Sequence, residues 1–215
     1  MAKNAAMLRQ WVPMLQASMD FDLADSSVTD ALGAALARSF PGAADAVPAD
    51  AVPAGAIVAR AIVAGAMQAD AVQADAVQAG AVLYLQGDLG AGKTSCARSL
   101  LRALGAAGLV RSPTYTLIET YQLGGLTCLH VDLYRLQSRT EVDELGLRDV
   151  VGPGCLLLVE WPERGCGALP PADLNLHLSY AGDARHAHLR ALTPLGIKWL
   201  DKLGRDNSFG AYVSN

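Results

Sequence analysis

The sequence of 215 residues has no excess of positive charge, since 17 Lys and Arg residues stand against 21 Asp and Glu residues and give a net charge of -4. A protein that binds nucleic acid over a broad surface usually carries a basic excess. We therefore expect any action on RNA to pass through a partner or a small local patch. Aromatic residues make up only 6% of the chain and much of its 52% hydrophobic content is alanine. The core must come from Leu and Val, which cluster between residues 81 and 195.

Cysteine is also scarce, and Cys96, Cys128, Cys155 and Cys166 lie far apart without a C-x-x-C pair. Neither a disulfide framework nor a zinc site is expected from this spacing. Isolated thiols in a reducing cytosol are the simpler interpretation.

Long hydrophobic runs are missing as well. Arg9, Gln10 and Pro13 interrupt the first 20 residues, so they do not form an apolar signal segment. The most apolar later stretch, residues 54–69, contains Arg60 and is shorter than the roughly 20 residues of a membrane helix. We expect a cytoplasmic protein that makes no contact with a membrane.

Residues 44–83 form a repeat of eight pentads with the pattern Ala-x-Ala-apolar-x. A period of five spreads the apolar positions around a helix and moves them to alternate faces of a strand. A square β-solenoid suits this period, and the pattern faintly resembles pentapeptide repeats. However, the central positions hold Ala or Val, and eight copies give only about two coils. We favour a low-complexity insertion at residues 41–80.

Outside the repeat, the chain has the pattern of an α/β protein. Residues 25–39 predict a capped helix, and further helices are predicted at 94–104 and 141–150. Apolar strands are predicted at 81–87, 126–132 and 155–160, and a closing antiparallel hairpin at 174–180 and 188–192. Strands separated by helices predict a mostly parallel sheet with helices on both faces.

The run GDLGAGKT at residues 87–94 satisfies the pattern G-x-x-x-x-G-K-[ST] between a predicted strand and a predicted helix. Its glycines let backbone N–H groups point at phosphate oxygens, and the helix adds the positive end of its dipole. Lys93 supplies a cation for the β- and γ-phosphates, and the Thr94 hydroxyl can bind magnesium. A glycine-rich turn with a chance Lys-Thr is the alternative, which the strand–loop–helix context disfavours. We predict a P-loop site for ATP and Mg²⁺.

Two acidic residues close apolar strands: Glu160 ends CLLLVE and Asp132 ends LHVD. A P-loop needs such an acid to hold magnesium or its water and to orient the attacking water. Either residue could be a solvated acid at a strand end. With a P-loop in the same sheet we favour function for both, and for Glu160 more strongly. No arginine stands out as an internal arginine finger, so we expect slow turnover.

The loop at residues 112–116, SPTYT, lies between the P-loop helix and the next strand. In P-loop switch proteins this region often contacts the γ-phosphate through hydroxyl groups. A proline-containing loop with capping hydroxyls explains the composition equally well, so both interpretations stay open.

Together these motifs closely resemble those of the bacterial TsaE family, formerly YjeE, an ATPase needed for threonylcarbamoyladenosine synthesis on tRNA. The matching segments are TDALGAALA (29–37), LQGDLGAGKT (85–94), SPTYTLIETY (112–121), HVDLYRL (130–136), ELGL (144–147) and VEWPE (159–163). The HxDLYRL and VEWP elements after SPTYTL are far more specific than the P-loop alone. The resemblance covers residues 21–40 and 81–195.

This resemblance implies a cytoplasmic protein that binds and slowly hydrolyses ATP. It implies two partners, the transferase TsaD and its companion TsaB, through which the protein would act on tRNA indirectly. ATP turnover would reset that complex between rounds of modification, and the protein itself would not transfer the group.

The resemblance also assigns roles to individual residues. Thr94 and Glu160 would bind magnesium, and the catalytic set is Lys93, Asp132 and Glu160. The implied nucleotide-binding set is Asp88, Leu89, Gly90, Ala91, Gly92, Lys93, Thr94, Ser95, Thr114, Trp161, Glu163 and Arg185. In this set Thr114 belongs to a switch-like loop, and Trp161 is a wall of the nucleotide site or a core residue. Arg185 lies where the C-terminal hairpin approaches the nucleotide.

The chain departs from the family in an insertion of about 40 residues where the family has a short turn. Loop-closure entropy grows slowly with length, so a surface excursion can be tolerated. The insertion could also weaken the docking of the N-terminal segment, which leaves contacts of Ser26 or Thr29 with the nucleotide open. We divide the chain into an extension (1–20), one ATPase domain (21–195) interrupted at 41–80, and a tail (196–215).

Two other functions remain possible from the sequence. A small-molecule kinase uses the same P-loop, but it usually needs a lid with arginines, and residues 137–155 offer only Arg139 and Arg148. A non-enzymatic interaction protein would use the pentad repeat as its active part.

Overall fold

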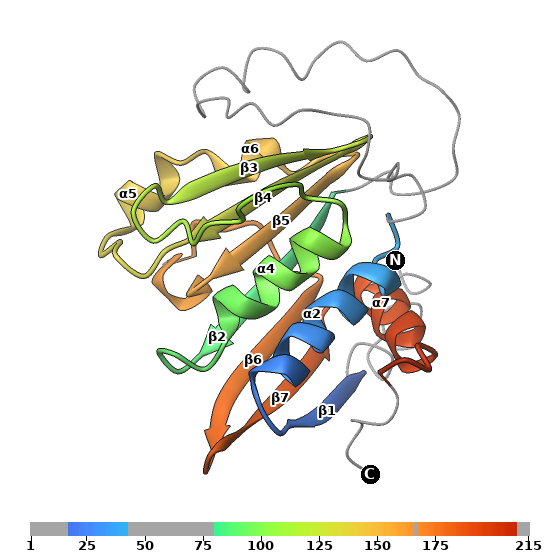
Figure 1. Ribbon diagram of the computed structural model, residues 1–215. Coiled ribbons are helices and arrows are strands. Elements are labelled where there is room, and N and C mark those ends of the chain that lie inside the picture. The colour runs from blue at the N-terminus through green and yellow to red at the C-terminus, as the bar shows by residue number, and fades with distance from the viewer. Residues whose placement is uncertain (1–16, 43–79, 166, 210–215) are drawn as a thin grey trace, which may run out of the picture.

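A computed structural model describes residues 17–42, 80–165 and 167–209 of the chain (Figure 1). Nearly all of the predicted insertion at 41–80, most of the predicted N-terminal extension and the last six residues lie outside the described residues. Among the residues that are described, no helix combines the length and the apolar character needed to cross a bilayer.

A seven-stranded sheet forms the centre of the described chain, in the order β1-β7-β6-β2-β5-β4-β3. In chain order, the strands are β1 (Ser18–Leu23), β2 (Ala81–Gly87), β3 (Ile118–Leu123), β4 (Leu126–Asp132), β5 (Cys155–Glu160), β6 (Leu174–Ala181) and β7 (Ala184–Ala191). The four central strands β6, β2, β5 and β4 run parallel, whereas the pairings of β1, β7 and β3 are antiparallel. The predicted α/β class, with its parallel centre and closing hairpin, is confirmed.

Helices lie on both faces of this sheet (Figure 1). They are α2 (Ser26–Ser39), α4 (Lys93–Ala103), α5 (Arg139–Asp143), α6 (Leu147–Val150), the 3-10 turn η4 (Pro162–Gly165) and α7 (Pro194–Gly204). The long helices α2, α4 and α7 cover one face, and the short helices α5 and α6 pack on the other.

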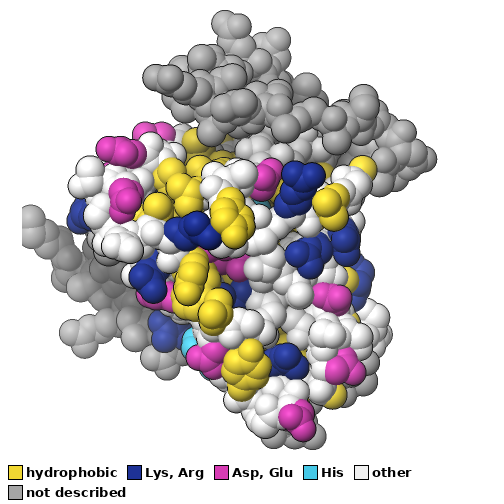
Figure 2. Space-filling model, turned by 60° about the vertical axis from the view of Figure 1, so that its left-hand side comes forward, with side chains coloured by type: hydrophobic (Ala, Val, Ile, Leu, Met, Phe, Trp, Pro, Cys, Tyr) yellow, Lys and Arg dark blue, Asp and Glu magenta, His cyan; other side chains and the backbone are white. Residues whose placement is uncertain are grey.

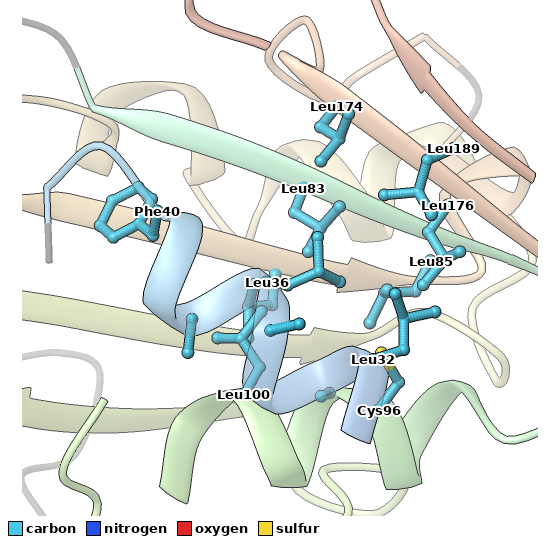
Figure 3. Packing of buried hydrophobic residues seen from close by; sticks show 14 of the residues in the cluster. Leu32, Leu36, Phe40, Leu83, Leu85, Cys96, Leu100, Leu174, Leu176 and Leu189 are labelled. Atoms are coloured by element: carbon cyan, nitrogen blue, oxygen red, sulfur yellow. The ribbon is translucent and has the colours of Figure 1, made fainter. Parts of the chain in front are cut away.

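Alternation along the central strands produces two separate cores. Leu83 and Leu85 of β2 point to the face of α2 and α4, where they pack with Leu32, Leu36 and Leu100 (Figure 3). Val82 of β2, together with Leu157 and Val159 of β5, points to the opposite face, beneath α5 and α6. Both faces of the central strands are therefore buried, which explains why β5 reads as an almost continuous apolar run.

Local chemistry explains where the helices begin and end. Asp25 caps α2, because its carboxylate accepts hydrogen bonds from the backbone N–H groups of Ser27 at 2.7 Å and Val28 at 3.2 Å. The single helix predicted at 141–150 is wrong, since it is divided into α5 and α6. Gly146 lies between them with a φ of 62°, a left-handed conformation that ends the first helical turn.

Four elements were not predicted: β1, β3, η4 and α7. Strand β1 starts inside the predicted extension, and most of helix α7 lies in the predicted tail, where the helix ends at Gly204. Helix α7 is anchored because the Trp199 indole N–H donates to the Leu36 carbonyl at 2.9 Å. Edge strand β3 was missed because only its last residue is fully buried, so it lacks the apolar run of a central strand.

The described cysteines are buried thiols. Cys96, Cys128 and Cys155 are free, and Cys166 lies outside the described residues. Burial raises the pKa of the Cys96 thiol to about 12, so this side chain behaves as a small apolar group in the core.

Helices α2 and α4 approach so closely that their contact requires a glycine. A Cβ atom at Gly33 would lie 2.3 Å from the carbonyl oxygen of Cys96, which is backbone and cannot move aside cheaply. We predict that Gly33→Ala lowers the free energy of unfolding by about 1–3 kcal/mol despite the better helix propensity of alanine. Urea unfolding measures this change. Gly152→Ala is the control, because a Cβ atom there meets nothing within 4 Å, and an equal effect of both changes would contradict the close contact.

Strand β1 is also held to β7 by charged groups on the solvent face of the sheet. The two ring nitrogens of His186 lie 3.0 Å from a carboxylate oxygen of Asp20 and 3.2 Å from one of Asp22. His188 Nδ1 lies 2.8 Å from the same oxygen of Asp20. Both nitrogens of His186 can donate only when the ring is protonated. The hydrogen bond to Asp22 accordingly raises the pKa of His186 above its ordinary 6.5.

This arrangement predicts a dependence of stability on pH. Because the folded pKa of His186 is raised, its stabilising effect is complete below pH 6.5 and is lost as the pH rises through the folded pKa. We expect His186→Gln to reduce the free energy of unfolding more at pH 5.5 than at pH 8.5, as measured by urea unfolding at both values. An effect that is the same at the two pH values would contradict the charged pairing.

Candidate functional site

The predicted site residues meet at the carboxyl ends of the parallel strands. Gly87, Asp132 and Glu160 end β2, β4 and β5, and the register places Asp132 directly beside Glu160. Ligands of open α/β sheets bind at this edge. Figure 2 turns this side of the molecule toward the viewer and shows hydrophobic side chains interspersed with Lys and Arg side chains.

The loop between β2 and α4 has the backbone of a phosphate-binding turn. Gly87, Gly90 and Gly92 have φ values of 118°, 79° and 112°, which side chains with a Cβ atom rarely adopt. At Gly87 a Cβ atom would lie 1.8 Å from the carbonyl oxygen of Leu178 on β6, so only glycine fits there. Helix α4 begins directly after Gly92, and no side chain caps its first N–H groups. Those free donors and the helix dipole are suited to an anion.

Lys93 is folded back onto this loop. Its ammonium group donates to the carbonyl oxygens of Gly87 at 2.8 Å and Asp88 at 2.7 Å, and it lies 3.8 Å from the ring centroid of Trp161. The residue is only 4% exposed. Burial lowers the pKa of Lys93, while the nearby carboxylates of Glu160, then Glu163, act in the opposite direction. The cation therefore lies at the centre of an acidic, water-poor site.

Glu160 connects the loop helix to two strands. Its Oε2 accepts a hydrogen bond from Thr94 Oγ1 at 2.7 Å, and its Oε1 lies 2.8 Å from His130 Nε2. The residue is 1% exposed and His130 is fully buried. The two predicted magnesium ligands, Thr94 and Glu160, are thus in direct contact, and both offer hard oxygen atoms.

Asp132 is bound to the hydroxyl-rich loop. Its Oδ2 accepts from Thr114 Oγ1 at 2.7 Å, and its Oδ1 accepts from the backbone N–H of Tyr134 at 2.9 Å. Ser112 Oγ lies 2.7 Å from the Thr114 hydroxyl and extends the chain of hydrogen bonds. The structure therefore brings the predicted acid and the predicted switch-like loop together.

Trp161 lies beside the site in an unusual backbone conformation. Its φ is 59°, which is rare for a bulky residue, and its backbone N–H donates to the Leu85 carbonyl at 3.2 Å. The Tyr134 ring packs against it with centroids 5.1 Å apart. A strained residue next to a buried lysine is typical of a functional site. Trp161 thus lies between the Lys93 ammonium group and the core beneath α5 and α6, so the interpretations as a wall of the site and as a core residue both stand.

The remaining predicted residues lie at different distances from this centre. Glu163 in η4 is close enough to influence the pKa of Lys93, whereas Leu89 is 66% exposed on the loop. Within the described ranges, Arg185 is connected to the loop through Tyr180. Its guanidinium lies 5.6 Å from the Tyr180 ring centroid, and the Tyr180 hydroxyl donates to the Leu89 carbonyl at 3.2 Å. Ser95 lies in the first turn of α4 and is partly buried.

Three site residues were not predicted: His130, Tyr134 and Tyr180. The signal for the first two was present in HVDLYRL, where they lie two positions before and after Asp132. His130 shares a strand face with Asp132 because side chains two apart point the same way. Tyr180 gave no local signal, since only the β2–β6 pairing brings it to the loop.

The donor atoms fit a magnesium ion bound together with a phosphate. Among residues 17–42, 80–165 and 167–209, no group of three or more His, Cys, Asp or Glu side chains is arranged to hold a metal ion. Magnesium does not require such a cage, because it keeps several waters and binds one or two protein oxygens plus substrate phosphates. The contact between Thr94 and Glu160 next to uncapped helix N–H groups meets that requirement.

Comparisons with known proteins agree with this geometry. A sequence model of the family described as "Threonylcarbamoyl adenosine biosynthesis protein TsaE" matches residues 63–188. The chain is 46% identical over 115 residues to the tRNA threonylcarbamoyladenosine biosynthesis protein TsaE of Haemophilus influenzae, a match that covers 54% of this chain and 73% of that protein. The protein of the same name from Bacillus subtilis is 39% identical over 102 residues, covering 47% of this chain and 63% of the relative, which is less than two thirds.

A solved structure supports the fold. The crystal structure of Bacillus subtilis YdiB superposes with a TM-score of 0.58, covers 88% of this chain and 96% of the other, and is 24% identical in sequence. At that identity the similarity applies to the fold alone.

Proposed function

The chain belongs to the TsaE family of threonylcarbamoyladenosine biosynthesis proteins, and from this premise we propose that it binds ATP with Mg²⁺ and hydrolyses ATP. The observation that supports the proposal most strongly is the hydrogen bond between Thr94 and Glu160 beside Lys93. A P-loop hydroxyl and an acid at the end of a neighbouring strand form the magnesium pair of P-loop ATPases.

The loop at residues 87–94 would bind the phosphates. Its backbone N–H groups and the uncapped start of α4 attract negative charge. The Lys93 ammonium now uses two loop carbonyls as acceptors, and phosphate oxygens are stronger acceptors for a cation. Lys93 would exchange the carbonyls for β- and γ-phosphate oxygens when the nucleotide binds.

Thr94 and Glu160 would hold the magnesium ion, Glu160 directly or through a water. When bound, the metal supplies positive charge that stabilises the transferring phosphoryl group. Because Glu160 is 1% exposed and already fixed by two hydrogen bonds, it needs little rearrangement to serve as a ligand.

Asp132 would orient the attacking water, and Thr114 would sense the γ-phosphate. Asp132 accepts two hydrogen bonds that fix its carboxylate at the strand end. The Thr114 hydroxyl donates to Asp132, so a phosphate that attracts Thr114 would release one oxygen of the acid. The loop at 112–116 would then report nucleotide state to the acid.

The pathway role follows from family membership, and its partners are part of the proposal. We propose that the protein acts on a complex of a TsaD-like transferase and a TsaB-like companion and meets tRNA only through that complex. The net charge of -4 agrees with an indirect role, because the chain has no basic excess to bind RNA by itself.

A small-molecule kinase is less well supported by the contacts. Of the two arginines that could serve a lid, Arg139 pairs with Asp143 at 3.2 Å and Arg148 donates to the carbonyl oxygen of Gly167. The first contact lies within one helical turn and the second joins α6 to a loop 19 residues later, and among the described residues neither arginine interacts with Lys93.

Single substitutions should separate binding from hydrolysis. We predict that Lys93→Ala abolishes measurable ATP binding, because the loop loses its only buried cation. Glu160→Ala should keep ATP binding but lower the hydrolysis rate about 100-fold or more. The variant lacks the carboxylate that would hold the magnesium ion, which stabilises the negative charge of the transition state. Calorimetry and phosphate release measure the two effects, with Asp201→Asn on the exposed side of α7 as control.

Transfer of labelled phosphate to a sugar or nucleoside, in place of free phosphate, would indicate a kinase.

The proposed pathway role predicts that partners accelerate turnover. Wild-type protein should hydrolyse ATP slowly alone and faster with a purified TsaD–TsaB pair, whereas Glu160→Ala should stay slow in both conditions. Steady-state phosphate release with and without the pair measures this. A wild-type rate that the pair leaves unchanged would contradict the partner assignment while leaving ATP hydrolysis intact.

A further inference from the structure

His130 is a buried polar residue to which the proposed function gives no role. It lies on β4, two residues before Asp132, and none of its surface is exposed. Its Nε2 lies 2.8 Å from Glu160 Oε1, and the Glu160 side chain is itself only 2% exposed. A histidine in the middle of a central strand requires a reason, because burial of an imidazole removes it from water.

We infer that His130 is a positioning residue, which holds the Glu160 carboxylate in the orientation that faces Thr94. This inference rests on the proposed function, because that function assigns magnesium to Thr94 and Glu160. Nothing in the proposed hydrolysis mechanism itself uses His130.

The two oxygens of Glu160 have separate partners on opposite sides. Thr94 Oγ1 donates to Oε2 at 2.7 Å, so Oε2 belongs to the side of the P-loop helix. His130 Nε2 contacts Oε1 from β4, the strand that pairs with β5 in parallel register. With an ionised Glu160 this contact assigns the tautomer of His130 that carries the proton on Nε2, because an ionised carboxylate only accepts hydrogen bonds. Together the two contacts fix the rotation of the carboxylate about its last bond.

The other ring nitrogen shows that His130 is not present for packing alone. Within the described part of the chain, His130 Nδ1 is buried and has no hydrogen-bond partner. An apolar side chain of similar volume would fill the same space without burying an unpaired nitrogen. In the part of the chain that the structure describes, the contact with Glu160 is the one polar interaction of the ring that offsets this cost.

A fixed carboxylate is a better metal ligand than a free one. Partners that orient the ligands of a metal typically change metal affinity or activity by about 10- to 100-fold when they are mutated. Without His130, Glu160 Oε1 would lose its partner, and the carboxylate could turn away from Thr94. Loss of His130 would therefore lower the affinity for magnesium, whereas the loop N–H groups and Lys93 would still bind phosphate.

The test compares nucleotide affinity with and without magnesium in the wild-type protein and three folded variants. Calorimetry with the non-hydrolysable analogue AMP-PNP gives the dissociation constant in EDTA and across a Mg²⁺ titration. Mg²⁺ should lower the dissociation constant of AMP-PNP, and for His130→Leu we expect the Mg²⁺ concentration that gives half of this decrease to rise about 10- to 100-fold. The dissociation constant in EDTA should be unchanged. His130→Gln, whose amide N–H can replace Nε2, should stay near wild type. His177→Leu on the exposed face of β6 is the matched control.

The other outcomes of this test would overturn the inference about His130. Equal weakening with and without Mg²⁺, together with a lower melting temperature, would mean a structural role and would overturn the inference. A wild-type-like Mg²⁺ titration for His130→Leu would overturn it while the proposed function stands. If wild type binds no AMP-PNP at any Mg²⁺ concentration, the proposed function and the inference fail together. If His130→Leu does not fold, His130→Asn takes its place, because its shorter amide does not reach Glu160 and the same rise is expected.

Discussion

The carboxylate of Glu160 joins three parts of the fold at one buried point. It ends β5, accepts a hydrogen bond from Thr94 at the start of α4, and contacts His130 of β4. These contacts exist because β4 and β5 pair in parallel, a register that places Asp132 level with Glu160. The close packing of α2 on α4 at Gly33 then holds the P-loop helix against the sheet. The sheet register is thus the constraint from which the geometry of the site follows.

The hydrogen-bond donors of the P-loop side chains are paired with acceptors of the protein itself. Lys93 donates to two carbonyls of its own loop, and Thr94 donates to Glu160, so the strongest donors of the site have acceptors within the protein. Burial lowers the pKa of Lys93, and the carboxylates of Glu160 and Glu163 counteract it. A bound triphosphate would have to replace these contacts with stronger ones. The slow turnover that we predict in the absence of a partner agrees with such a self-contained arrangement.

The central part of this structure could be predicted from the sequence because it is encoded locally. The strands at 81–87, 126–132 and 155–160 are apolar runs buried on both faces, and each ends at a residue of the site. Elements at the edges were harder, because half-buried strands such as β3 carry a weak apolar pattern. Strand β1 does alternate, with Phe21 and Leu23 buried on either side of the exposed Asp22, but its six residues follow a segment without any pattern.

Contacts that depend on tertiary structure could not be read from the chain. The left-handed conformation of Trp161 and its position over Lys93 result from the strand ends meeting, and no local residue pattern encodes them. The motif HVDLYRL contains His130, but its contact with Glu160, which lies 30 residues away on the neighbouring strand, is not encoded in that motif. The assignment of Glu160, Asp132, Thr94 and Thr114 to one site was a prediction from motif order, and the structure brings these four side chains into two hydrogen-bonded pairs.

A crystal structure with AMP-PNP and Mg²⁺ would test the central claim most directly. The account predicts the triphosphate in the loop at residues 87–94, with the Lys93 ammonium moved from the Gly87 and Asp88 carbonyls to phosphate oxygens. It also predicts a magnesium ion in contact with the Thr94 hydroxyl and near Glu160. A nucleotide bound elsewhere, with Lys93 still on its two carbonyls and Thr94 still on Glu160, would contradict the account.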